Sequence, residues 1–353
     1  MYRGKQKAER NFGIYSLYVM FYPQLVAGPI ERPQNLLHQF REKHFFEYQR
    51  VVDGLKLMAW GLFKKIVVAD QLALAVNFVY KNPADHTGLT LIIATVFFAF
   101  QIYCDFSGYS DIAIGAAQVM GFKLMDNFNR PYLSQSISEF WKRWHISLST
   151  WFRDYVYIPL GGNKVSTLYW QFNIFITFLI SGLWHGANWT FVIWGALNGF
   201  YLLFAHWTKN IRNTIVAYTK LSKFPTFYKW LQVLTTFTLV CIAWIFFRAD
   251  TLSDAWYIVT HLGEGLTHII NLKYIQEALG PSGLGLNTNQ LLNSVLALAF
   301  FGFIEYIEPA GTARHLFSEK PAWVRWTMYL LIILGIVFLW GYTDSNNFIY
   351  FQF

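Results

Sequence analysis

The sequence predicts an all-α, polytopic integral membrane protein, in which a bundle of helices crosses the bilayer several times. Of its 353 residues, 55% are hydrophobic and 14% are charged, whereas an ordinary soluble domain carries roughly 25% charged residues. So few charges could not cover a soluble protein that must also hide 34 Phe, 21 Tyr and 15 Trp. The stretch 165–208 contains no Asp, Glu, Lys or Arg, and it is long enough for two helices that each cross about 30 Å of hydrocarbon.

Other uncharged runs predict further helices, roughly seven to nine spanning or half-spanning ones in all by the length rule. Trp326–Thr343 is strongly apolar in its middle and predicts a spanning helix. Asn11–Ile30 contains two glycines and two prolines, which favours a short helix followed by a bent loop. The remaining runs that predict helices are His86–Cys104, Trp230–Phe247 and Ala278–Ile304.

Charged stretches separate these runs within a single membrane-embedded domain over residues 1–353. Val51–Tyr80 mixes apolar residues with lysines and aspartates, which predicts either an interfacial helix pair or a helix shielded by its neighbours. Lys123–Lys164 is too charged to face lipid. Lys209–Lys229 carries five basic residues and no acid, so we expect it in the cytoplasm. The net charge of +8 therefore indicates cytoplasmic loops and contact with membrane lipid, and no nucleic-acid site is expected.

Several common catalytic motifs do not occur in the sequence. We find no H-E-x-x-H, no G-x-x-x-x-G-K-[ST], no G-x-S-x-G and no C-x-x-C. Cys104 and Cys241 both lie in apolar segments and indicate neither a disulfide framework nor a metal site. We therefore expect no metal and no bound cofactor.

A dense polar and aromatic block runs from Phe140 to Tyr155 and contains His145 and Arg143. Its three tryptophans are typical of an anchor at the membrane interface. Its cations could instead bind lipid headgroups or an anionic acyl donor.

A second candidate site surrounds His185, near the middle of the uncharged stretch. An imidazole there is costly unless it is hydrogen-bonded or lines a polar cavity. Neutral imidazole accepts a proton from a hydroxyl near pH 7 and can return it. The sequence leaves open whether Trp184–Asn188 forms a tight surface turn or a break in a helix inside the bilayer, and whether His185 is structural or functional.

Asp105 and Asp111 form a third polar cluster and flank Ser107. The prediction for the carboxylates is a polar seam that faces the protein interior and pairs with Arg130, Lys142 or Arg143. Direct catalysis by these carboxylates is the less favoured alternative.

Five segments together resemble the membrane-bound O-acyltransferase (MBOAT) superfamily. The chain is most similar to the bacterial branch of the alginate O-acetyltransferase membrane subunit and its relatives that acylate other polysaccharides. The segments occur in one order along the whole chain: Leu17–Pro33, Tyr103–Asp111, Phe140–Asp154, Trp184–Gly186 and Phe348–Phe353. Such proteins usually have several further spanning helices before the Tyr-Arg-Gly segment with which this sequence opens, so the resemblance implies an N-terminally short member.

The resemblance implies a helical bundle around a central tunnel, in a multi-pass protein of the inner or plasma membrane. It implies His185 and His145 as catalytic residues. It also implies that an acyl group, expected to be acetyl from acetyl-CoA or another cytoplasmic thioester, passes across the membrane for O-acetylation of an exocellular polysaccharide such as alginate. A periplasmic or extracellular acetyltransferase is the expected partner.

On this basis His185 is predicted to act as general base, and His145 to position the acceptor or stabilise charge. Donor chemistry makes Asn188 and Trp184 candidates for the oxyanion, and Arg143, Asp105 and Ser107 are candidates for substrate binding or support. Two alternatives remain open: D-alanyl transfer to teichoic acid, and a non-catalytic export conduit or scaffold.

Overall fold

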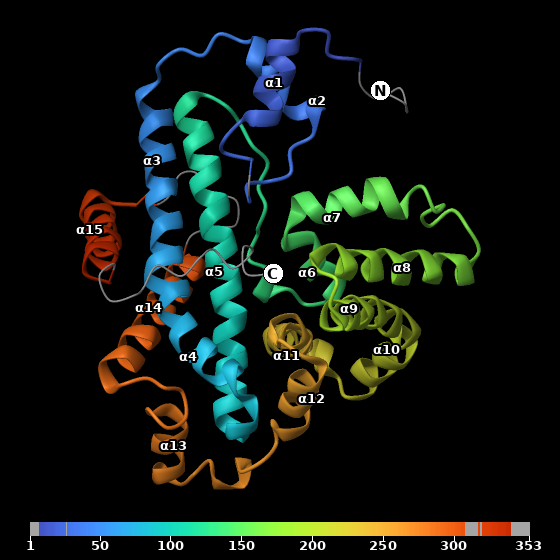
Figure 1. Ribbon diagram of the computed structural model, residues 1–353. Helices are drawn as coiled ribbons and strands as arrows, with labels where there is room; N and C mark the ends of the chain where they lie inside the picture. The colour runs from blue at the N-terminus through green and yellow to red at the C-terminus, as the bar shows by residue number, and fades with distance from the viewer. Residues whose placement is uncertain (1–6, 26, 308–316, 318–319, 340–353) are drawn as a thin grey trace. The chain divides into compact units, whose positions relative to one another are not determined.

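A computed structural model describes residues 7–25, 27–307, 317 and 320–339, and these residues form helices and turns without a strand (Figure 1). The predicted all-α class is confirmed. The motif at 348–353 lies outside the described residues. The chain divides into two compact units. The first takes the described parts of 1–71, 101–129 and 294–352, and the second takes those of 72–100 and 130–293.

The first unit begins with the short helix that the sequence predicts, because Asn11 accepts a hydrogen bond from the Ile14 amide and caps α1. The backbone becomes extended at Phe21, two residues before Pro23, and this ends the helix. The elements of this unit are α1 (Phe12–Met20), α2 (Pro33–Leu36), η1 (Gln39–Arg41), α3 (Tyr48–Leu62), the π-helical η2 (Phe63–Ala69), the second part of α5 (Gly88–Met120), the end of α14 (Thr288–Ile307) and α15 (Ala322–Leu339).

Helices α3 and α5 approach so closely within the first unit that their backbones nearly touch. A Cβ atom at Gly61 would lie 2.5 Å from the Gly108 carbonyl oxygen, and one at Gly54 would lie 2.8 Å from the Gly115 carbonyl oxygen. Small residues allow this approach between helices in membranes. Of the two readings of Val51–Tyr80, the structure therefore favours a helix shielded by its neighbours.

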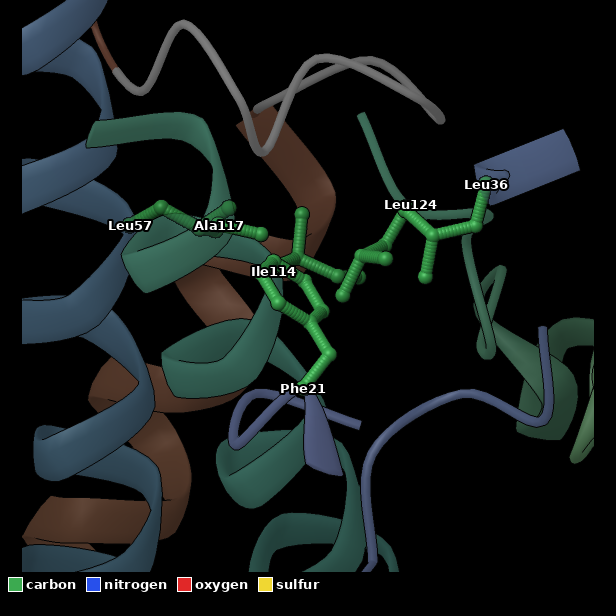
Figure 2. Close-up of a cluster of buried hydrophobic side chains, with 6 residues drawn as sticks. All are labelled: Phe21, Leu36, Leu57, Ile114, Ala117 and Leu124. Carbon is green, nitrogen blue, oxygen red and sulfur yellow. The ribbon is translucent and has the colours of Figure 1, made fainter. Parts of the chain in front are cut away.

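An apolar cluster joins the N-terminal segment to these two helices. Figure 2 shows its six side chains between α2 and α3. Phe21 meets the rings of Phe40 and Phe122 edge to face, and these two rings are tilted against each other, with all three centroids 5.0–5.3 Å apart. The six buried residues are Phe21, Leu36, Leu57, Ile114, Ala117 and Leu124. This packing fixes the bent loop after α1 against the helices.

The second unit contains the polar and aromatic block and the long uncharged stretch. Its elements are most of α4 (Asp70–Lys81), η3 (Pro83–Asp85), the first part of α5, η4 (Pro131–Leu133), α6 (Ile137–Arg143), α7 (Ile146–Phe152), η5 (Arg153–Tyr157), α8 (Thr167–His185), α9 (Trp189–Trp207), α10 (Lys209–Tyr218), η6 (Leu221–Lys223), α11 (Pro225–Arg248), α12 (Leu252–His261), η7 (Leu266–His268), α13 (Leu272–Leu279) and the start of α14.

Among the described residues, four helices are long and apolar enough to cross a membrane, namely α5, α11, α14 and α15. The protein is therefore a multi-pass membrane protein. The sequence-based count of seven to nine is higher because it includes half-spanning segments. The uncharged stretch yields two helices of 19 residues each, α8 and α9, and they carry polar Asn, Gln, Thr and His among their apolar residues.

We predict that Gly61→Val destabilises the protein by about 1–3 kcal/mol or more, because its side chain would enter the space of the Gly108 backbone. Thermal unfolding in detergent measures the effect. Gly302→Val is the control, since a Cβ atom at Gly302 meets nothing within 4 Å. Equal melting temperatures for the two variants would contradict the close α3–α5 contact.

Candidate functional site

Helices α8 and α9 form an antiparallel hairpin whose turn carries His185. A Cβ atom at Gly182 would lie 2.3 Å from the Phe191 carbonyl oxygen, and one at Gly195 would lie 2.4 Å from the Phe178 carbonyl oxygen. Such contacts leave no room for a side chain at either glycine. His185 is the last residue of α8, and α9 begins four residues later at Trp189. Of the two open placements, the structure thus has a tight turn between two helices.

Asn188 fixes this turn at two points. Its side-chain oxygen accepts a hydrogen bond from the Thr190 amide at 3.2 Å and caps α9. Its side-chain nitrogen donates to the Asp250 carbonyl oxygen at 3.1 Å, just beyond the end of α11. Both ends of the carboxamide are thus engaged in holding the turn. The arrangement favours a positioning role for Asn188 over the predicted oxyanion contact.

Three aromatic rings surround the imidazole of His185. The ring centroids of Trp184, Trp194 and Phe247 lie 5.0, 5.1 and 5.2 Å from that of His185, with interplanar angles of 77°, 87° and 78°. Near-perpendicular contacts at this distance are favourable between aromatic rings. They restrict the orientation of the imidazole on three sides.

His145 occupies the junction between α6 and α7 in an unusual backbone conformation. Its φ of 43° and ψ of 55° are left-handed, and its side chain is buried. A residue with a side chain adopts this conformation only when its surroundings impose it, and such residues cluster at functional sites. Here the conformation lets two successive side chains, Trp144 and His145, both enter the interior.

A continuous set of rings connects the two histidine motifs, and we call Trp144, Trp194, Trp244 and Phe247 the aromatic wall. Trp244 lies 5.0 Å from Trp144 and stacks on Trp194 at 6.0 Å with an interplanar angle of 17°. Phe247 lies 5.3 Å from Trp194. These rings come from the α6–α7 junction, α9 and α11, which are far apart in the sequence.

The two imidazoles interact electrostatically across this region. Burial lowers the pKa of His145 well below its ordinary value, and the neighbouring His185 lowers it further. His145 is thus neutral at neutral pH, and a neutral imidazole has one nitrogen that accepts and one that donates a hydrogen bond. The two histidines predicted as catalytic come together in the second unit.

The other predicted site residues of this unit have different surroundings. Arg143 forms an ion pair with Glu139, one helical turn away, at 2.5 Å. Trp184 is 53% exposed, and its ring contacts His185 and Phe152. Arg143 and Trp184 therefore lie on the two segments that carry the histidines.

Asp105 and Ser107 lie in the first unit, in a network with two lysines, of which Lys64 is buried and Lys65 is partly buried. Lys65 Nζ lies 2.7 Å from Asp105 and 2.9 Å from Asp70. Lys64 Nζ donates to the Ser107 hydroxyl at 2.9 Å and lies 2.7 Å from Asp111. The predicted interior polar seam exists, but the sequence interpretation named the wrong cations, Arg130, Lys142 or Arg143. The lysines of η2 provide the charges, because this π-helical segment packs along α5 one turn beyond the contact at Gly61.

Sequence reasoning missed the aromatic wall and the partners of the two lysines of η2. Trp244 and Phe247 are three residues apart and therefore share one face of α11. This spacing is the feature of the sequence that indicates the aromatic wall. It does not stand out in a chain with 20% aromatic residues. The sequence shows Lys64 and Lys65 only as charged residues of an amphipathic stretch and does not specify their partners.

Comparison with known proteins identifies the family. Residues 10–247 match the MBOAT, membrane-bound O-acyltransferase, family. The probable alginate O-acetylase AlgI of Pseudomonas aeruginosa is 40% identical over 88% of this chain and 57% of its own length. The corresponding protein of Pseudomonas putida is 36% identical over 100% of this chain and 71% of its own. The peptidoglycan O-acetyltransferase of Helicobacter pylori is 34% identical over 97% of this chain and 65% of its own.

This chain therefore belongs to the membrane-bound O-acyltransferase family. It spans about half to seven tenths of the length of the curated relatives it matches. The recognition made from the sequence motifs is confirmed.

We predict that Asn188→Ala loosens the turn that carries His185, because it removes both the cap on α9 and the bond to Asp250. Loss of a helix cap of this kind costs about 1 kcal/mol. Hydrogen exchange of the backbone amides at Thr190 and Phe191 should accelerate. Asn188→Asp is the matched variant, since it keeps the cap acceptor and loses only the donor to Asp250, and its exchange should be intermediate. Unchanged exchange in Asn188→Ala would show that the turn does not depend on this side chain.

A second prediction concerns the lysine network of the first unit. Lys65→Met removes the cation that Asp70 and Asp105 share, and loss of one partner from a buried ion pair costs about 3–5 kcal/mol. The melting temperature in detergent should therefore fall markedly. Lys123→Met, at an exposed lysine of the same unit, is the control and should leave it nearly unchanged. Equal melting temperatures would refute a stabilising role for the network.

Proposed function

We propose that this chain carries the acyl-transfer centre of a membrane O-acyltransferase. In this proposal an acetyl group passes from a cytoplasmic thioester such as acetyl-CoA toward a hydroxyl on the opposite face of the membrane, for the O-acetylation of an exocellular polysaccharide such as alginate. The observation that carries the proposal is the meeting of His145 and His185, which come from two separate motifs, beside one aromatic wall.

His185 is the proposed general base. Its neutral imidazole accepts the proton of the acceptor hydroxyl while the oxygen attacks the thioester carbonyl. The bond between carbon and sulfur then breaks, and the thiolate takes the proton back from the imidazolium to leave as a free thiol. The products are an ester and a thiol, so protons and electrons balance without any metal or redox cofactor.

His145 is the proposed second member of the centre. Because burial keeps it neutral, one of its ring nitrogens can donate a hydrogen bond to the acceptor or to the developing oxyanion. Trp184 lies beside the reacting imidazole and offers an indole N–H for the same purpose. Arg143, on the helix that leads to His145, is the proposed contact for an anionic group of the donor, while Asp105 and Ser107 are proposed to support the first unit through the lysine network.

The relatives support acetyl as the transferred group. The three relatives described above are named for O-acetyl transfer to alginate or peptidoglycan, which favours acetyl over D-alanyl transfer for this chain. A polysaccharide acceptor, a periplasmic or extracellular acetyltransferase partner and a central tunnel between the two faces all belong to this proposal. Catalysis by two histidines also distinguishes it from a non-catalytic conduit, which needs no base.

The test is acyl transfer by the full chain in lipid nanodiscs with labelled acetyl-CoA and an alginate acceptor. His185→Ala is expected to lower the rate by about 10²–10⁴-fold, the usual contribution of a general base. His206→Ala is the matched control, because His206 lies on the other helix of the same hairpin and is exposed, and it should keep the rate. Thermal unfolding establishes that both variants are folded.

Two results would refute the proposal. Full transfer by a folded His185→Ala variant would remove the assignment of the base. Absence of transfer by the unaltered protein from acetyl-CoA, together with transfer from a D-alanyl carrier protein, would replace the acetyl donor with a D-alanyl donor.

A further inference from the structure

The chain between α9 and α11 differs from the helices on either side of it. It comprises α10 (Lys209–Tyr218), η6 (Leu221–Lys223) and the start of α11, and we call residues 209–229 the basic segment. No residue of α10 is buried. Within the described part of the protein, α10 contacts the end of α9 and the adjacent η6 but buries no face against them, so its surroundings must supply much of its stability.

One side of α10 is apolar and exposed. Ile211, Ile215 and Tyr218 are spaced at i, i+4 and i+7 and thus form one stripe along the helix. They are 62%, 52% and 87% exposed. Further apolar side chains are exposed beyond the helix, namely those of Phe224 and Phe227. These side chains indicate contact with an apolar environment.

The same segment is strongly basic. No Asp or Glu occurs between Asp154 and Asp250, so no nearby residue in the sequence can neutralise its cations. Within the described residues, none of the five cations forms an ion pair. Arg212 also donates to the Ala205 carbonyl oxygen at 2.5 Å, near the end of α9, and this bond holds the start of α10 against the hairpin. The cations are Lys209, Arg212, Lys220, Lys223 and Lys229.

We infer that the basic segment lies in the plane of the membrane interface and binds the phosphate-bearing headgroups of anionic lipids. The hydrocarbon core would solvate the apolar stripe but would remove five cations from water at a high energetic cost. Water would solvate the cations but would leave the apolar stripe exposed. The interface satisfies both, as it does for other amphipathic basic helices.

The neighbouring helix supports this location over a docking site for a soluble acidic protein. The spanning helix α11 begins at Pro225, seven residues after the end of α10. Since Lys220 and Lys223 lie in this short connection and Lys229 in the first turns of α11, the membrane surface must pass close to them. A soluble partner would match the charges but would leave the stripe of Ile211, Ile215 and Tyr218 unexplained.

Spin labelling of the full chain in nanodiscs tests the location. Tyr218→Cys places a label on the most exposed residue of the stripe, and the unaltered protein is the blank because Cys104 and Cys241 are both buried. The depth of the label is measured by comparing its relaxation by oxygen with its relaxation by a water-soluble nickel chelate. We expect it in the lipid interface. A label as accessible to the chelate as a free spin label in water would overturn the inference, and would be the result expected for a surface that docks a soluble acidic protein.

The charge requirement is tested in nanodiscs that contain both phosphatidylglycerol and phosphatidylcholine. Lipid retained by the purified protein should be enriched in phosphatidylglycerol over the starting mixture, by about fivefold overall, the preference that corresponds to one contact between a cation and an anionic headgroup. The variant K209Q/R212Q/K220Q/K223Q should lose most of this enrichment. The variant K209R/K220R/K223R keeps the charge and should retain it. Equal enrichment in the glutamine variant and the unaltered protein would overturn the proposed headgroup binding.

Discussion

The structure depends on one constraint, namely that a polar or charged side chain removed from water needs a defined partner. In the first unit the partners are carboxylates. Lys64 and Lys65 meet Asp111 and Asp105 at 2.7 Å in each case. In the second unit the polar groups of the site are imidazoles, and three aromatic rings contact His185. Charged pairs favour a single arrangement of the helices. The aromatic rings instead restrict the orientation of an imidazole without fixing its charge. Such surroundings suit a group that must gain and lose a proton.

Close backbone contact is what makes these partners available. The lysines of η2 reach α5 because Gly61 and Gly108, which have no side chains, let the backbones of α3 and α5 approach closely. In the α8–α9 hairpin, Gly182 and Gly195 play the same role and place His185 beside Trp194. A bulky side chain at one of these glycines would push the two packed helices apart and lengthen the contacts between their side chains.

The sequence predicted the helical class, the short helix at the start and the two helices of the uncharged stretch, because these depend on local composition and on residues such as Pro23. An imidazole in an uncharged stretch singles out His185 as a candidate, whereas His145 lies among charged residues and becomes a candidate only through the family resemblance. The sequence did not predict the partners of Asp105 or the aromatic wall. These are contacts between elements distant in the chain, and neither the charge of a lysine nor the spacing of a tryptophan specifies which helix it will face.

The backbone of His145 shows why the aromatic wall matters for the site and not only for stability. A left-handed residue other than glycine costs about 1–3 kcal/mol, and His145 has this conformation while its side chain is buried. The compensation comes from Trp144, whose ring lies 5.0 Å from Trp244, stacks on Phe140 at 5.6 Å and lies 6.0 Å from Tyr132. Three aromatic pairs at about 0.5–1.5 kcal/mol each are sufficient to offset the strain. Because Trp144 is the residue directly before His145, its packing sets the direction from which that imidazole enters the site. The wall also contacts His185 directly through Trp194 and Phe247, so the geometry of both histidines depends on these rings.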